Sequence, residues 1–112
     1  MTVRELIAQI PFEMLVEGDL DREISGGYTG DLLSWVMGRA KSGDAWLTVM
    51  GNVNAIAVCV LADVSCLILC ENAALDDAAR TRAELEGVTV LRSAATAYAL
   101  AGALHTFLEK TV

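Results

Sequence analysis

The 112-residue sequence lacks any run of 18 uncharged apolar residues, at Met1 or further along the chain. A helix that spans a bilayer needs about 20 predominantly apolar residues. The longest apolar stretch covers only residues 55–62, and the first residues do not have the pattern of a secretory signal. We therefore expect no membrane contact and a cytoplasmic location.

Clusters of basic residues are also missing. The 8 Lys and Arg are scattered, and the 15 Asp and Glu bring the formal net charge to −7. Nucleic acids and anionic membranes are bound by basic surfaces. The charge balance therefore argues against nucleic acid and membrane as partners.

Metal-binding side chains are few, with three Cys and one His. The apolar surroundings of Cys59, Cys66 and Cys70, and their odd number, predict reduced, buried thiols. Cys66 and Cys70 share one face of a predicted strand, roughly 13 Å apart, which is too far for a disulfide. His105 lies 35 residues further on, so we expect no metal and interpret His105 as a packed or interface residue.

The sequence has no phosphate-binding loop of the type Gly-x4-Gly-Lys-Ser/Thr. The nearest segment, residues 38–43, contains Lys-Ser but no Gly in front of the Lys. No other catalytic combination of side chains stands out. We expect a protein without enzymatic activity of its own and without a cofactor.

Apolar residues are abundant, at 54 % of the chain. We expect one domain over residues 1–112, large enough for a core that needs no disulfide or metal. The apolar surplus predicts a subunit interface, and a homodimer is the simplest assembly.

The central segment, residues 44–72, predicts a strand, a helix and a second strand. An apolar run ends at Gly51, two Asn with capping chemistry follow, a helix leads to Asp63, and a second apolar run ends at Glu71. This pattern is typical of a βαβ unit whose parallel strands are buried on both faces.

The flanking segments predict the remaining elements. Thr2 and Glu5 form a capping box for a helix within residues 1–11, followed by a strand near residues 12–16. We expect a short strand around Ile24, a helix over 32–37 capped by Asp31, a helix over 75–86, a strand over 88–91 and a last helix to about 108 that begins at Ser93 or Thr96. The prediction is an α/β fold: a three-layer α/β/α domain with a mostly parallel sheet of about five strands.

The carboxyl ends of parallel strands meet at one rim of such a sheet, where open α/β sheets bind ligands. Main-chain N–H groups at a helix start can hold an anion there. The candidate ligand-binding residues on this rim are Gly51, Asn52, Asn54, Glu71, Asn72, Arg92 and Ser93. The alternative is that the Gly and Asn residues serve only the turn and the helix cap.

Two segments are candidates for the subunit interface. The last helix is small and apolar nearly all round, so one sheet cannot cover it. The Gly-rich segment before the 32–37 helix implies positive φ or close approach of another group, either as a ligand lid or as a tight connection. The candidate interface residues are Gly26, Gly27, Tyr28, Trp35, Ala97 and Ala101.

Turn chemistry and spacing over residues 12–108 resemble DRTGG-domain proteins of the small stand-alone kind. The resemblance is carried by Gly-Gly-Tyr-Thr-Gly-Asp-Leu-Leu-Ser-Trp at 26–35, Gly-Asp-Ala-Trp-Leu-Thr at 43–48, Asn-Val-Asn-Ala-Ile-Ala-Val at 52–58, Glu-Leu-Glu-Gly-Val at 84–88 and Tyr-Ala-Leu-Ala-Gly at 98–102. The motif that gives the family its name is absent; the nearest segment, residues 50–53, lacks the Asp and the Arg.

The resemblance implies a fold similar to the N-terminal domain of HPr kinase/phosphorylase. It implies a non-enzymatic regulatory or scaffold role in a bacterial homodimer, with a possible protein partner in a hydrogenase or redox system. Two alternatives are an adenine-nucleotide sensor that binds at the rim and an accessory of an HPr-kinase-like enzyme.

Overall fold

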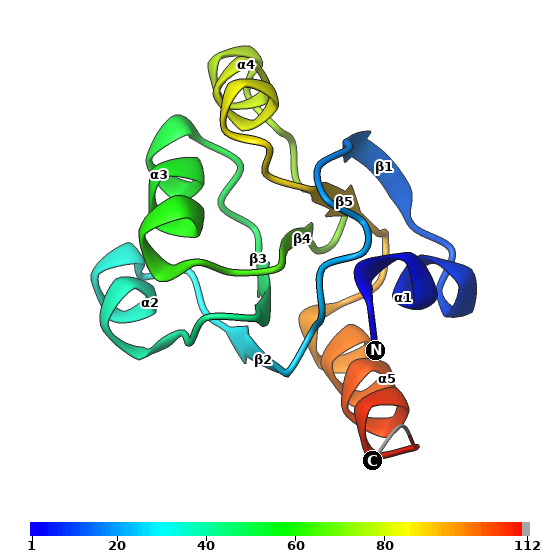
Figure 1. The fold of residues 1–112 in the computed structure, drawn as a ribbon. Coiled ribbons are helices and arrows are strands. Elements are labelled where there is room, and N and C mark those ends of the chain that lie inside the picture. Colours follow the sequence, from blue (N-terminus) through cyan, green and yellow to red (C-terminus); the bar gives the residue numbers. More distant parts are fainter. Residues whose placement is uncertain (111–112) are drawn as a thin grey trace.

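The computed structural model describes residues 1–110, and the elements follow the predicted order (Figure 1). They are α1 (Val3–Gln9), β1 (Glu13–Val16), β2 (Gly26–Thr29), α2 (Leu33–Arg39), β3 (Asp44–Thr48), α3 (Val53–Ala62), β4 (Cys66–Leu69), α4 (Asp77–Glu86), β5 (Val90–Arg92) and α5 (Ala97–Lys110). The capping box predicted at Thr2 and Glu5 is present at the start of α1.

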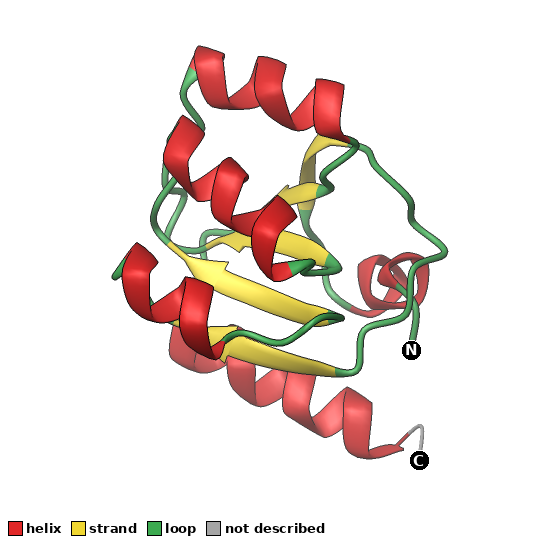
Figure 2. Ribbon diagram, turned by 60° about the vertical axis from the view of Figure 1, so that its left-hand side comes forward, coloured by secondary structure: helices red, strands yellow, loops and turns green. Residues whose placement is uncertain are grey.

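The sheet has the strand order β1-β5-β4-β3-β2. β1 is antiparallel to β5, and the other pairs are parallel. From β2 to β5 each crossover moves to the next strand in the same direction, so α2, α3 and α4 lie together on one face. α1 and α5 cover the other face (Figure 2). The predicted three-layer α/β/α fold is confirmed.

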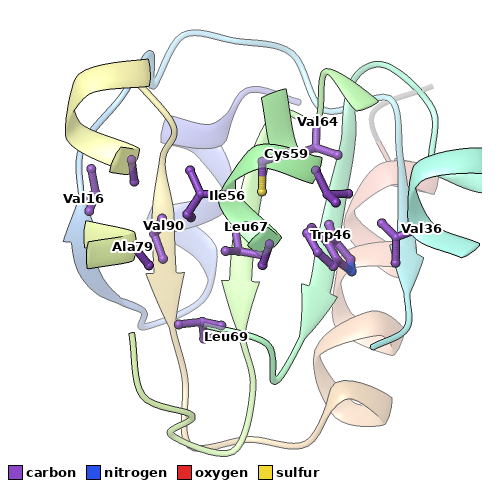
Figure 3. Packing of buried hydrophobic residues seen from close by; sticks show 13 residues of the cluster. Val16, Val36, Trp46, Ile56, Cys59, Val64, Leu67, Leu69, Ala79 and Val90 are labelled. Atoms are coloured by element: carbon purple, nitrogen blue, oxygen red, sulfur yellow. The ribbon is translucent and has the colours of Figure 1, made fainter. Parts of the chain in front are cut away.

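Each face of the sheet has its own core. Figure 3 shows the first, where Trp46 of β3 and Leu67 of β4 face Ile56 and Cys59 of α3. The second core joins alternate residues of the same strands to Leu6 of α1 and to Leu100 and Leu104 of α5. Because β3 and β4 are buried on both sides, their apolar residues follow one another without alternation, over 45–47 in β3 and 66–69 in β4.

The predicted cap at Asp31 is wrong. The N-cap of α2 is Leu32, which makes no side-chain cap bond. The Asp31 carboxylate instead accepts hydrogen bonds from the Thr48 hydroxyl at 2.6 Å and from the Val49 N–H at 3.1 Å. It therefore connects the segment before α2 to the end of β3, a contact between distant residues that local spacing does not reveal.

The second strand also differs from its prediction. Ile24 is buried but lies before the strand, which is the Gly-rich segment Gly26–Thr29 itself. Neither Gly26 nor Gly27 has a positive φ. Close approach is the feature they share: a Cβ would lie 2.9 Å from Asp44 Oδ1 at Gly26 and 3.0 Å from Leu104 Cδ2 at Gly27.

Arg80 lies four residues from both Asp76 and Glu84, but among the described residues it forms an ion pair with neither. Its guanidinium donates a 2.6 Å hydrogen bond to the Leu15 carbonyl in β1. Arg82 and Glu86, also four residues apart on α4, do form an ion pair at 3.1 Å.

Gly51 allows the loop after β4 to pack on the start of α3, and its replacement by Ala should destabilise the fold. A Cβ at this position would overlap the Ala74 carbonyl, whose carbon lies 2.9 Å away. We expect Gly51→Ala to lower the free energy of unfolding by roughly 1–3 kcal/mol.

Gly102→Ala is the matched control, because Gly102 lies inside α5 with no atom near its added Cβ. It should raise stability by about 0.5–1 kcal/mol. Urea unfolding of both variants measures the difference. Equal stabilities would contradict the packing of the loop on Gly51.

Candidate functional site

The predicted rim residues do lie at the carboxyl ends of neighbouring parallel strands. Glu71 and Asn72 follow β4, and Ser93 follows β5. The Glu71 N–H donates to the Ala95 carbonyl and the Asn72 N–H to the Ser93 carbonyl, each at 2.9 Å. The structure therefore joins these two loops through their main chains.

This connection occupies the position where a crevice is expected. After β4 the chain turns toward the face of α4, and after β5 toward the face of α5. Adjacent strands whose connections leave to opposite faces form the usual ligand crevice of open α/β sheets. Here Glu71 and Asn72, both with φ of 55°, bend the loop back onto residues 93–95, so that two main-chain hydrogen bonds cross this position.

Within residues 1–110, two further rim residues, Gly51 and Asn52, serve structural contacts, whereas Asn54 does not. Gly51 is buried against Ala74, and the Asn52 side-chain oxygen accepts from the Ala55 N–H at 2.9 Å as the cap of α3. Asn54 is exposed in the first turn of α3.

Arg92, the cation predicted for the rim, is paired with the Glu13 carboxylate. The contacts are 2.9, 3.1 and 3.1 Å long. Arg92 is the last residue of β5, and β4 lies between β5 and β3. Arg92 is therefore about 10 Å from the end of β3, which leads to Gly51 and Asn52. Ligand binding at the rim stays a prediction.

A cavity of about 610 Å³ lies at the β2 edge of the sheet, between β2 and α5. Its volume is in the range of small-molecule sites. We name it the α5 groove. Its lining is largely apolar and includes Ile24, Leu47, Ala101 and Leu104. His105 and Glu109 also line it, with His105 Nε2 2.9 Å from Glu109 Oε1.

A second hollow, of about 400 Å³, lies by the same strand and is polar; we name it the basic groove. It is lined by residues 25–28 and by Arg39, Lys41, Ser42 and Asp44. The Arg39 guanidinium lies 3.8 Å from the centre of the Trp35 ring. Asp44 is buried and accepts a 2.8 Å hydrogen bond from the Lys41 main-chain N–H.

Four of the predicted interface residues line the α5 groove, namely Gly26, Gly27, Tyr28 and Ala101. Trp35 lies on α2 and is 53 % exposed, whereas Ala97 packs partly against the core beneath α5. Arg39 and Lys41 were not predicted as site residues. The sequence does hold a clue to them: two cations separated by a single residue in an acidic chain, followed by Ser42 and Gly43.

The three thiols are buried, as predicted. Cys66 and Cys70 contribute to the α5-side core, and Cys59 to the core under α3. Burial raises the pKa of Cys66 to about 12 and that of Cys70 to about 11, and it raises the pKa of Cys59 as well. Among residues 1–110, no three His, Cys, Asp or Glu side chains gather as a metal site would require.

No protein-family model and no curated protein matches the sequence. Among solved structures, the fold is similar to the crystal structure of the CBS and DRTGG domains of the regulatory region of Clostridium perfringens pyrophosphatase, complexed with the activator diadenosine tetraphosphate. The TM-score is 0.69 at 10 % identity, over 90 % of this chain and 44 % of that one. The chain thus spans less than half of that structure, and the likeness supports the predicted DRTGG-like fold. None of the helices in the described part of the chain is both long and apolar enough to cross a bilayer.

Opposite charge changes test anion binding at the rim. Asn52→Asp keeps a capping side chain and adds a negative charge, so it should weaken phosphate binding by roughly two- to fivefold. Glu13→Gln removes the partner of Arg92 and should strengthen it. Chemical-shift titration with inorganic phosphate measures both. Unchanged affinities in both variants would place any anion elsewhere.

The thiols should resist alkylation in the folded protein. The pKa of Cys70 is raised from 9.0 to about 11, which leaves about 100-fold less thiolate at pH 8 than in the unfolded chain. Because folding raises these pKa values, the thiols stabilise the fold below pH about 9, and this contribution falls as the pH rises toward 11. Iodoacetamide labelling with mass spectrometry, native against urea-unfolded, measures the reactivity. Equal labelling in both states would contradict the burial.

Proposed function

We propose that this chain is a non-enzymatic regulatory or scaffold domain of the DRTGG type, one domain over residues 1–112, that acts as a homodimer. The observation that supports dimerisation best is the outer side of α3. This helix contains no charged residue. Ala55, Ile56 and Cys59 are buried on its inner side, but Val60 and Leu61 on its outer side are 43 % and 69 % exposed.

α2 extends this apolar surface. It lies beside α3 in the helical layer (Figure 1) and leaves Leu32, Trp35 and Met37 exposed at or next to it. We name this surface the α2–α3 face; its residues are Leu32, Trp35, Met37, Val53, Val60 and Leu61. A helix that is apolar on all sides is normally covered on all sides, and exposed apolar patches mark interaction sites.

Charge supports the same surface. The chain carries −7, so two copies repel one another over most of their surfaces. Neither α2 nor α3 has an acidic residue, whereas α4 on the other side of α3 carries Asp77, Glu84 and Glu86. Contact through the α2–α3 face therefore keeps most acidic side chains of the two copies apart.

α5 supports dimerisation less than its composition suggested. Leu100 and Leu104 are buried on the sheet, and the exposed side carries Tyr98, Gly102 and Thr106. Of the interface residues predicted from the sequence, Trp35 belongs to the α2–α3 face. The others form the alternative contact, around β2 and α5.

The regulatory role is supported by the solved structure of similar fold, which is a regulatory region with a bound activator. A kinship with the HPr kinase N-terminal domain, a cytoplasmic location and a partner in a redox or hydrogenase system belong to the same proposal. A second candidate, an adenine-nucleotide sensor, is favoured by the dinucleotide in that complex. A rise in melting temperature with diadenosine tetraphosphate or ATP would support it, since a ligand that binds only the folded state stabilises it.

Leu61→Glu should separate the dimer. Leu61 is exposed in the monomer, so the change places a charge in the contact without affecting the core. We expect the native protein to sediment at about twice 11.9 kDa at micromolar concentration, and Leu61→Glu to raise the dissociation constant at least about tenfold.

Leu85→Glu is the matched control, because Leu85 is 80 % exposed on the charged helix α4. It should sediment like the native protein. A native species near 11.9 kDa would refute the dimer. Dissociation by Ala101→Lys but not by Leu61→Glu would move the contact to α5.

A further inference from the structure

We propose that the open edge of β2 binds an extended segment of a partner protein, in which apolar and acidic side chains alternate, as an additional strand of the sheet. This inference goes beyond the proposed dimer and uses a different surface. It is supported by the difference between the two edges of the sheet, by the grooves beside β2 and by the charge of the basic groove.

The β1 edge has features that prevent further pairing. The pairing of β1 with β5 shifts register between Met14 and Val16. The Arg80 guanidinium donates a hydrogen bond to the Leu15 carbonyl, which is then not available to another strand. Glu13 in β1 and Glu17 just after it add negative charges to this edge. Irregular pairing, inserted side chains and charges are the usual means by which proteins block edge pairing.

The β2 edge has none of these features within its described residues. Gly26–Thr29 contains no charged residue and pairs with β3 in an unbroken register. Just after the strand, the Gly30 N–H donates to the Leu47 carbonyl of β3 at 3.2 Å. In a parallel ladder alternate residues bond to the neighbouring strand, so Gly26 and Tyr28 face β3, and the main-chain groups of Gly27 and Thr29 are directed to the open side.

The grooves indicate which side chains the partner strand carries. Both are bounded by Gly26, Gly27 and Tyr28, so both adjoin the open edge. Successive side chains of a strand point to opposite faces of the sheet. One set of the partner's side chains therefore enters the apolar α5 groove, and the alternate set enters the basic groove.

The basic groove contains two cations, Arg39 and Lys41, against the one carboxylate of Asp44, so its excess positive charge favours acidic side chains. Of the 8 Lys and Arg, Arg4, Arg22, Arg82 and Arg92 have carboxylate partners. Within residues 1–110, neither the Arg39 nor the Lys41 side chain has an ion pair or a hydrogen bond, although acids outnumber bases in the chain. Arg39 is held against the Trp35 ring, so little of its freedom is lost on binding.

A second copy of this chain does not fit the edge. Pairing of β2 with another β2 would direct two glycines toward the grooves and leave both unfilled. β1 does alternate acidic and apolar residues, but Glu13 is paired with Arg92 and Val16 is buried in the core. The occupant is therefore a segment of a different protein, in the mode of β-strand addition.

The test uses two synthetic peptides, Ser-Glu-Val-Glu-Ile-Glu-Leu-Ser and the same sequence with Lys in place of each Glu. The native protein should bind the Glu peptide at least about tenfold more tightly than the Lys peptide. The double variant Arg39→Glu, Lys41→Glu should reverse this preference. Both residues are exposed, so the variant should fold, and its far-UV circular dichroism should match that of the native protein.

Amide hydrogen exchange locates the peptide. Binding should slow exchange at Gly27 and Thr29 and leave β1 unchanged. Absence of binding, equal affinity for the two peptides, or protection at another element would overturn the proposal. Concentration-dependent filaments of the protein alone that the Glu peptide dissolves would also overturn it, because a second copy would then be the occupant.

The Leu61→Glu variant separates this proposal from the dimer. Its peptide affinity should equal that of the native protein, since Leu61 lines neither groove beside β2. A monomeric native protein that binds the Glu peptide would refute the dimer and support strand addition. A native dimer that binds neither peptide would support the dimer and refute strand addition.

Discussion

The burial of β3 and β4 on both faces is the constraint from which the other features of the structure follow. Every residue of these two strands is buried, including Trp46, whose indole N–H donates to the Gly30 carbonyl at 2.9 Å. A parallel sheet without an exposed face needs helices on both sides. Three crossovers in the same direction place α2, α3 and α4 on one side, which leaves α1 and α5 to cover the other.

The same constraint explains why the exposed apolar residues gather where they do. α3 lies between α2 and α4 over the middle of the sheet, so its inner side and both flanks are covered and only one stripe remains open. A helix in this position gains stability from apolar residues at nearly every site. Val60 and Leu61 are apolar as well, although they lie on the open stripe. Packing within one copy of the chain does not explain them, whereas contact with a second copy would.

Much of this fold could be predicted from the sequence because its signals are local. The Thr2 capping box and the Asn52 cap each depend on residues within one turn. The contacts that could not be predicted join distant residues, such as Arg80 with the Leu15 carbonyl, 65 positions apart.

The candidate site also combines features that could be predicted from the sequence with features that could not. Parallel strands place residues 51, 71 and 93 on one rim, which spacing alone predicts. The main-chain bonds from Glu71 and Asn72 that join the two rim loops depend on two left-handed residues that are not glycine, and no local sequence pattern predicts this conformation. The β2 strand was placed two residues too early because glycine is a poor strand former, and its pairing with β3 is set by tertiary packing.

Arg39 and Lys41 influence both kinds of contact that the β2 edge can make. If two β2 edges paired around a two-fold axis, the basic grooves on the same face of the sheet would meet. Each groove has two cations and one carboxylate, so two positively charged grooves would then approach one another, and like charges at close range oppose association. An acidic strand at the same edge gains from the same side chains. The pair therefore disfavours the self-association to which an open strand edge is prone and favours a partner of opposite charge, so one feature contributes to both affinity and specificity.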